Sequence, residues 1–333
     1  MVRPLTQKDG RPTASIRPAR RALLLGTASA CTLMPAPAWS RPPSASSDTQ
    51  TPGSKTVKAP AALTRRSFRT SDGVRLSWLA GGTASRLDPL LFLPGWCMPA
   101  DIFMPQLQAF ASSRTVWALD LRGQGESEIP QRGYEADRRA RDLFEFLGKM
   151  RRAPIVVAWS LAGIEMLHGL RRFGDARLKA LVLVDSSLGE GPAGNGEGVA
   201  AFRAALSNDR AATLEGFARA IFRTQQPPEY IAHLVAAMSR APLEASQSML
   251  DYRLPREGLR DTARRFGKPL MVTCIPQYRE QARLHSEARP QTRVELFEEA
   301  GHALFVDEPE RFNRVLDSFS RSLKAGSPGK PRR

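Results

Sequence analysis

A serine stands at the junction between an apolar run and a helical pattern in the middle of the chain. Residues 155–163 read Ile-Val-Val-Ala-Trp-Ser-Leu-Ala-Gly, so that Ser160 directly follows the apolar segment. A sharp strand-to-helix turn of this kind presents a serine hydroxyl above a sheet, and it needs small residues two positions before and after, here Ala158 and Ala162. Glycine is usual at both places. For this segment alone, an ordinary helix N-cap serine is the alternative interpretation.

Two backbone N–H groups are candidates to stabilise an oxyanion that forms beside this serine. If Ser160 opens a helix, the N–H of Leu161 lies at the positive end of the helix dipole. Upstream, residues 90–96 read Leu-Leu-Phe-Leu-Pro-Gly-Trp, a short apolar run that ends in a glycine turn. The N–H of Trp96 is therefore the second candidate donor of an oxyanion hole.

The general base for Ser160 must come from a set of four histidines. His302 lies within residues 297–309, on a predicted loop between the last apolar run and the closing helix. The other three lie within predicted helices or the helical segment, where a surface or packing role explains them more easily: His168, His233 and His285. We expect His302 to accept the serine proton.

Short apolar runs alternate with helical patterns from Leu63 onward. Nearly continuous Val, Leu and Ile runs are typical of strands that are buried on both faces. We therefore predict an α/β fold with a mostly parallel central sheet flanked by helices. The predicted strands are 74–80, 90–93, 115–119, 155–158, 181–184, 270–274 and 294–297, and the predicted helices include 136–150, 161–173 and 309–323.

One long interval, between Val184 and Leu270, interrupts this alternation. It contains a glycine-rich stretch and helical patterns around 202–222 and 230–249, but no clear strand. A loop of this length without structure of its own is uncommon in a compact domain. We predict a helical cap at 189–261, inserted after the sixth core strand, so that the core consists of 63–188 and 262–323.

Taken in chain order, these motifs resemble the α/β-hydrolase superfamily over about residues 63–323. They include the glycine-rich turn at 120–127 and the chain order of serine first and histidine last. The pairing of Leu-Pro-Gly-Trp at 93–96 with Trp-Ser-Leu at 159–161 is similar to pimeloyl-ACP methyl ester carboxylesterases and their near relatives.

This resemblance implies hydrolysis of a small or medium carboxylic ester through an acyl-enzyme on Ser160, with no cofactor and no metal ion. Two alternatives stay open. An acyltransferase or perhydrolase would use the same acyl-enzyme. A catalytically decayed ligand-binding protein on the same scaffold is the other alternative, because the family's acid and both glycines around the serine are replaced.

The acid that should orient His302 is not at its usual place. The family carries Gly-x-x-Asp after the strand at 270–274, but here Tyr278 falls about where the Asp belongs. Asp185, at the end of the strand 181–184, and Glu280 are the two candidates. We favour Asp185, because Glu280 lies in a charged, helical stretch that is typical of a solvent-facing surface. A Ser–His dyad would need neither acid.

The chain has 49 Lys and Arg residues against 33 Asp and Glu residues, a formal net charge of +16. The basic residues are mostly arginines spread along the whole chain, without a basic cluster interleaved with aromatics and without a recognisable nucleic-acid motif. We therefore expect a small-molecule ester as partner and no nucleic acid.

The first 38 residues are predicted to be a signal peptide. Arg20 and Arg21 precede an apolar run at 22–34, and Ala-Pro-Ala at 36–38 fits a signal-peptidase site. The arginine pair resembles a twin-arginine signal, with an ordinary secretory signal as the alternative. Residues 39–62 are predicted to be a disordered linker and 324–333 a disordered tail. We expect export to the bacterial periplasm or the medium, with no stable membrane span in the mature chain.

Overall fold

The computed structural model of the protein describes residues 62–192, 197–251 and 254–325. The predicted signal peptide (1–38) lies outside the described residues, as do 39–61 of the predicted linker and 326–333 of the predicted tail. The last helix, α11 (Pro309–Ala325), ends two residues beyond its predicted end at 323.

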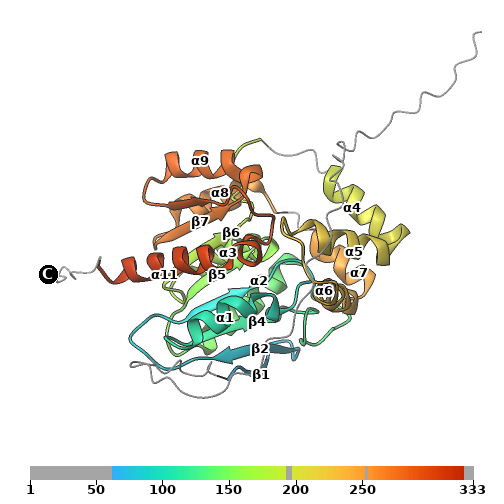
Figure 1. The fold of residues 1–333 in the computed structure, drawn as a ribbon, viewed down its shortest axis with the longest axis horizontal. Helices are drawn as coiled ribbons and strands as arrows, with labels where there is room; N and C mark the ends of the chain where they lie inside the picture. The colour runs from blue at the N-terminus through green and yellow to red at the C-terminus, as the bar shows by residue number, and fades with distance from the viewer. Residues whose placement is uncertain (1–61, 193–196, 252–253, 326–333) are drawn as a thin grey trace, which may run out of the picture. The chain divides into compact units, whose positions relative to one another are not determined.

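An eight-stranded sheet lies at the centre of the fold, in the order β1-β2-β4-β3-β5-β6-β7-β8 (Figure 1). The pairings of β1 with β2 and of β2 with β4 are antiparallel, and every other pairing is parallel. The mostly parallel sheet is thereby confirmed. The strands are β1 (Thr64–Arg69), β2 (Arg75–Gly81), β3 (Leu90–Leu93), β4 (Val116–Leu119), β5 (Ile155–Trp159), β6 (Ala180–Val184), β7 (Leu270–Cys274) and β8 (Arg293–Leu296).

The seven predicted strands lie within one residue of the observed bounds of β2 to β8, whereas β1 was not predicted. Every residue of β3, β5, β6 and β7 is buried, which explains their nearly continuous apolar sequences. In contrast, β1 is an edge strand with the mostly exposed sequence Thr-Arg-Arg-Ser-Phe-Arg. Charged residues on an exposed edge protect a sheet against pairing with another chain, and they also hide the strand from hydrophobic pattern analysis.

Helices flank the sheet in two groups (Figure 1). In one group, α1 (Met104–Ala111) packs against α11, and α10 (Leu304–Asp307) leads into α11. In the other, α3 (Leu161–Phe173) packs against both α2 (Ala136–Lys149) and α8 (Arg256–Arg265). Helix α9 (Arg279–Ala288) lies beside β7 and β8. Short 3₁₀ turns at Ala100–Phe103 and Pro276–Tyr278 complete the core.

The interval between β6 and β7 is helical, as the sequence predicted. Four of its helices gather at one end of the sheet: α4 (Glu197–Asn208), α5 (Arg210–Ala220), α6 (Pro228–Arg240) and α7 (Leu243–Leu250) (Figure 1). We call these four helices the cap. The predicted cap boundary at residue 261 falls inside α8, which packs against α3 of the core. The boundary therefore belongs before α8.

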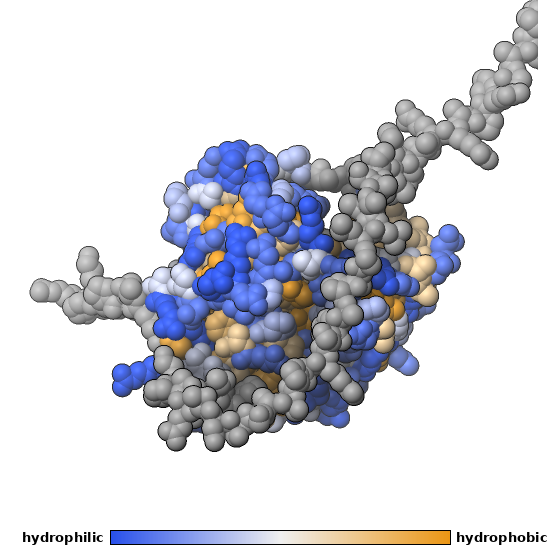
Figure 2. All heavy atoms as spheres, viewed as in Figure 1, coloured by the Kyte–Doolittle hydropathy of each residue, from blue (hydrophilic) through white to orange (hydrophobic). Residues whose placement is uncertain are grey.

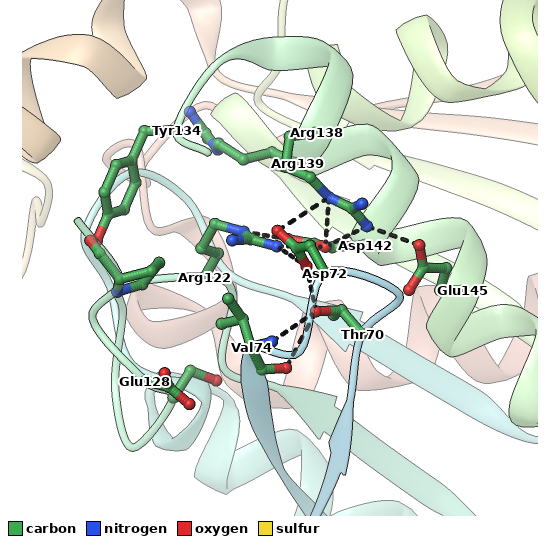
Figure 3. A network of polar contacts seen from close by, with 12 residues as sticks. Thr70, Asp72, Val74, Arg122, Glu128, Tyr134, Arg138, Arg139, Asp142 and Glu145 are labelled. Carbon is green, nitrogen blue, oxygen red and sulfur yellow. Dashed lines mark hydrogen bonds and ion pairs between the residues drawn. The ribbon is translucent and has the colours of Figure 1, made fainter. Parts of the chain in front are cut away.

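A buried network of charges holds the turn after β4 in place (Figure 3). Arg122 of this turn donates to Asp142 of α2 at 2.7 and 3.0 Å and to Asp72 of the β1–β2 turn at 2.8 Å. Arg138 adds hydrogen bonds to Asp142 and Glu145. Burial raises the pKa of Asp72, but the hydrogen bonds from Arg122 and Thr70 and the charges of Arg122 and Arg138 together outweigh burial, and the pKa falls to about 2. Pairing with carboxylates in this way is what makes a buried guanidinium tolerable.

The surface in view in Figure 2 is mostly hydrophilic, with smaller hydrophobic patches between the polar side chains. Within the three described ranges, no helix combines the length and apolar character that a membrane span requires.

Candidate active site

Ser160 occupies the sharp turn between β5 and α3. Its backbone has φ +55° and ψ −120°, a strained conformation for a residue with a side chain. Although Ser160 holds the N-cap position of α3, its hydroxyl makes no capping hydrogen bond. The small residues Ala158 and Ala162 are fully buried on either side. The N-cap interpretation therefore does not account for this serine, because its side chain is directed elsewhere.

The hydroxyl of Ser160 lies beside His302, in the loop between β8 and α10. The distance from Ser160 Oγ to His302 Nε2 is 2.9 Å, and His302 Nδ1 lies 2.5 Å from Asp185 Oδ2. Asp185 follows β6, is 1% exposed, and its other carboxylate oxygen accepts the N–H of Ile275 at 3.0 Å. The structure thus brings Ser160, His302 and Asp185 into one hydrogen-bonded chain, the arrangement of a catalytic triad.

The two predicted oxyanion donors both lie near this serine. Leu161 is the first residue of α3, where backbone N–H groups have no partner within the helix. Trp96 follows Gly95 in the loop after β3, and this loop passes so close to the serine that a Cβ on Gly95 would lie 3.1 Å from the Cβ of Ser160. Trp96 and Leu161 line the same cavity as Ser160 and His302.

Backbone strain is concentrated around this cavity. Among the described residues, the non-glycine residues with positive φ are Cys97, Ser160 and Asp185, at +55°, +55° and +43°. Ser160 and Asp185 directly follow β5 and β6, and Cys97 lies in the loop after β3; these three strands are neighbours in the sheet. Strained residues persist where the surrounding structure holds them for function. Two of the strained residues, Ser160 and Asp185, are residues that the sequence predicted for the site.

The model of the Alpha/beta hydrolase family matches residues 90–315. The chain belongs to this family. It is 22% identical over 255 residues to the AB hydrolase superfamily protein YisY of Bacillus subtilis (strain 168). This alignment covers 70% of this chain and 92% of YisY. The finer resemblance to pimeloyl-ACP methyl ester carboxylesterases stays a prediction.

Solved structures of the same fold include enzymes of different chemistry. The esterase EaEST from Exiguobacterium antarcticum aligns with a TM-score of 0.69 and 22% identity, over 77% of this chain and 98% of that one. A bromoperoxidase from Bacillus anthracis aligns with a TM-score of 0.68 and 19% identity, over 78% and 99%. At these identities the matches show the α/β-hydrolase fold and not a substrate.

The alternative acid of this hydrolase, Glu280, lies away from His302. It stands exposed in the first turn of α9, where Arg283 donates to both of its carboxylate oxygens at 2.8 Å. Hydrogen bonding by Arg283 lowers the pKa of Glu280. Tyr278, which takes the family's usual Asp position, lines the cavity with Ser160. Of the two candidate acids, the structure brings Asp185 and not Glu280 to the histidine.

The remaining histidines of this hydrolase are engaged elsewhere. His168 Nε2 lies 2.6 Å from Asp137 on α2, and His233 of the cap lies 3.2 Å from both carboxylate oxygens of Asp101. His285 is fully buried in α9. In the part of the chain that the structure describes, no group of three or more His, Cys, Asp and Glu side chains could hold a metal ion.

Gln124 holds the loop at residues 95–98 after β3, which carries Trp96 and which we call the oxyanion loop. The sequence did not reveal this role. Its side-chain oxygen accepts the N–H of Cys97 at 3.0 Å, and its amide nitrogen donates to the carbonyls of Gly95 and Met98 at 3.1 and 3.2 Å. Trp96 lies between these partners. Because Gln124 stands in the turn that Arg122 anchors, the network in Figure 3 supports the oxyanion loop indirectly.

The loop of His302 is held from two sides. The indole N–H of Trp159, the residue before the serine, donates to the carbonyl of His302 at 2.9 Å. Asp307 accepts the N–H of Gly301 at 2.7 Å, and it also accepts two N–H groups of residues 223–224, between α5 and α6, at 2.8 and 3.0 Å. Asp307 therefore ties the histidine loop to the cap.

Proposed function

We propose that this hydrolase is a serine esterase that cleaves a small or medium carboxylic ester through an acyl-enzyme intermediate. The observation that carries the proposal is the continuous chain Asp185–His302–Ser160, with separations of 2.5 and 2.9 Å. Both distances lie within hydrogen-bond reach of a general base and its nucleophile.

In the first half-reaction, Ser160 Oγ bonds to the ester carbonyl carbon while His302 Nε2 takes the hydroxyl proton. The carbonyl oxygen becomes an oxyanion, which the N–H groups of Trp96 and Leu161 stabilise. His302 then gives its proton to the alkoxy oxygen, the bond from carbon to that oxygen breaks, and the alcohol leaves. The acyl group remains as an ester on Ser160.

In the second half-reaction, His302 takes a proton from water as the water oxygen bonds to the acyl carbon. A second oxyanion forms in the same place, and its collapse breaks the bond to Ser160 Oγ, which regains the proton from His302. The carboxylic acid then leaves. Throughout, Asp185 holds the histidine tautomer that leaves Nε2 free to accept a proton, and it stabilises the imidazolium.

The aligned EaEST is an esterase, which supports the ester as substrate class. The aligned bromoperoxidase keeps the perhydrolase or acyltransferase alternative open, because hydrogen peroxide or a second alcohol can replace water in the second half-reaction. The decayed-protein alternative is disfavoured, because a binding protein has no need of three aligned groups and a strained serine.

The test is covalent labelling followed by product analysis. A fluorophosphonate should modify the wild-type chain once, at Ser160, and should not modify the Ser160→Ala variant. The labelled chain should lose hydrolysis of p-nitrophenyl butyrate in proportion to labelling. A chain that neither labels nor cleaves the ester would favour a decayed binding protein, and product capture by added hydrogen peroxide would favour a perhydrolase.

Export is a second part of the proposal. It rests on Arg20, Arg21, the apolar run at 22–34 and the small residues at 36–38. Replacing both arginines by lysine should leave unprocessed precursor in the cytoplasm if the twin-arginine route is used. Normal processing of this variant would support the general secretory route.

A further inference from the structure

The cavity around Ser160 is small. Its volume is about 180 Å³, whereas pockets for drug-sized ligands measure roughly 300–1,000 Å³. Three aromatic side chains form one of its walls: Trp96 from the oxyanion loop, Phe202 from α4 and Phe217 from α5. Their ring centroids are 5.3 Å (Trp96–Phe202), 5.5 Å (Trp96–Phe217) and 5.3 Å (Phe202–Phe217) apart, so the three rings form a closed triangle.

The side chain of Trp96 is held in place by contacts with the cap. Trp96 is 4% exposed, and its indole N–H donates to the carbonyl of Ser246 in α7 at 2.7 Å. Both phenylalanines meet the indole edge to face, at interplanar angles of 73° and 89°. Displacing the Trp96 ring would break the hydrogen bond and both aromatic contacts. The size of the cavity is therefore set by Phe202 and Phe217 against a fixed tryptophan.

The proposed mechanism decides which part of the ester this wall limits. The alcohol leaves after the first half-reaction, but the acyl group stays bonded to Ser160 Oγ and must fit beside it until water attacks. Leu161, Ile164 and Leu250 extend the apolar surface of the cavity. Asp185 also lines the cavity. A negatively charged acyl group would therefore meet both an apolar wall and the negative charge of this carboxylate.

Resting on the proposed function, we infer that the acyl group is compact, uncharged and apolar, and that Phe202 and Phe217 set its upper length. The two phenylalanines are specificity-determining residues. They belong to the cap, so the same core with other residues at 202 and 217 would accept longer acyl groups.

The experiment measures kcat/KM for p-nitrophenyl acetate, butyrate, benzoate, octanoate and hemisuccinate. For the wild-type chain, octanoate and hemisuccinate should each fall roughly 10-fold or more below butyrate, because an apolar pocket of fixed size discriminates on this scale. In Phe217→Ala and Phe202→Ala, the ratio of kcat/KM for octanoate to kcat/KM for butyrate should rise by about 10-fold. The kcat/KM for the hemisuccinate should stay low. Phe217→Leu, a milder change, should give an intermediate ratio.

The matched control is Phe222→Ala. Phe222 is also a buried phenylalanine of the cap region, but it packs against Tyr230, at 6.0 Å between ring centroids. This variant loses a similar packing contact and should leave the octanoate-to-butyrate ratio unchanged. Equal shifts in Phe217→Ala and Phe222→Ala would overturn the inference, as would wild-type cleavage of octanoate or hemisuccinate as fast as butyrate.

Fluorophosphonate labelling, measured in parallel, separates this inference from the proposed function. Labelling at Ser160 together with an acyl-length profile that ignores Phe202 and Phe217 overturns the inference and leaves the esterase in place. No labelling and no cleavage of any ester overturns the proposed function, and the inference with it. Labelling of each variant also shows that it has folded around its serine.

Discussion

Two carboxylate–histidine pairs involve residues that follow β6, and only one of them has a serine beside it. Asp185 lies 2.5 Å from His302, whose other ring nitrogen lies 2.9 Å from Ser160. Five residues further along, Glu190 lies 3.5 Å from His285. The second pair resembles the first in residue types and in burial of the acid, but its surroundings differ in two ways.

The first difference is the charge on the acid. Arg264 donates to both carboxylate oxygens of Glu190, at 2.7 and 2.6 Å, and so neutralises it. Asp185 instead accepts a backbone N–H, which leaves its charge to act on His302. The second difference is access: the side chain of His302 is 25% exposed, toward the cavity, whereas His285 is fully buried. We therefore expect a histidine next to an acid to serve as a catalytic base only when the acid's charge is uncompensated and solvent or substrate can reach the ring.

The largest expected effect on activity comes from removing the serine that lies beside the first pair. Ser160→Ala should lower kcat by about 10⁶-fold, because the hydroxyl provides the chemistry and little packing. The melting temperature should stay close to that of the wild-type chain. A purified, folded variant that keeps more than a few per cent of wild-type kcat would show that the nucleophile lies elsewhere.

The next largest effect should come from the acid. Asp185→Asn should lower kcat by roughly 10⁴-fold, because the amide favours the wrong histidine tautomer and cannot stabilise the imidazolium. Two matched variants sharpen the comparison: Glu280→Gln removes the exposed alternative acid, and Glu190→Gln removes the acid of the second pair. Both should keep kcat within about 2-fold, while Glu190→Gln should lower the melting temperature because Arg264 loses its partner.

The outcome for these three variants decides the assignment. A loss of kcat confined to Glu280→Gln would contradict Asp185 as the acid. No loss in either Asp185→Asn or Glu280→Gln would mean that the enzyme works as a Ser160–His302 dyad.

A smaller effect should follow from loosening the loop that carries the first histidine. Asp307→Asn exchanges one of two acceptor oxygens for a donor, and it weakens the tie between Gly301 and the cap. A displaced His302 should lower kcat by about 10 to 100-fold with little change in KM, because catalysis is sensitive to shifts of an ångström or less. Glu310→Gln, at an exposed carboxylate in α11, is the control and should have no effect. A rise in KM with unchanged kcat would instead place Asp307 in substrate binding.

Much of this fold could be predicted because buried parallel strands leave continuous apolar runs, as in β3 and β5 to β7. The cap was harder. The helical patterns at 202–222 and 230–249 each contain parts of two helices, since Asp209 caps α5 through the N–H of Ala212 and Pro242, which cannot continue α6, directly precedes α7. Asp209 and Pro242 are visible in the sequence as signals of a helix start. The helical patterns of apolar residues nevertheless extended past both positions.

In the site, Ser160 and His302 were predictable from local motifs, and Asp185 from its place at a strand end. Gln124, Trp159 and Asp307 were not, because each of them contacts a segment that lies 26 to 143 residues away along the chain. A single sequence shows the candidate reacting groups, whereas the side chains that position them are defined by contacts between distant segments.

The smallest effect concerns the second pair, where the expected change is in stability and not in rate. His285 is surrounded by Glu190 from the loop after β6, Arg264 from α8, and Arg289 and Thr292 after α9. Burial lowers the pKa of His285 below its ordinary 6.5, although Glu190 acts in the opposite direction. As the pH falls below about 6.5, the unfolded chain binds a proton at this histidine before the folded chain does, so the stability present above that pH is progressively lost.

The melting temperature of the wild-type chain should therefore fall between pH 7.5 and 5.5 by more than that of His285→Gln, which has no such proton to bind. His233→Gln removes an exposed histidine of the cap and should follow the wild-type curve, and kcat at pH 7.5 should be unchanged in both variants. If His285→Gln and the wild-type chain lose stability in parallel on acidification, His285 does not carry this pH dependence. If His285→Gln loses kcat while keeping its fold, the second pair is part of the catalytic machinery and the distinction between the two pairs fails.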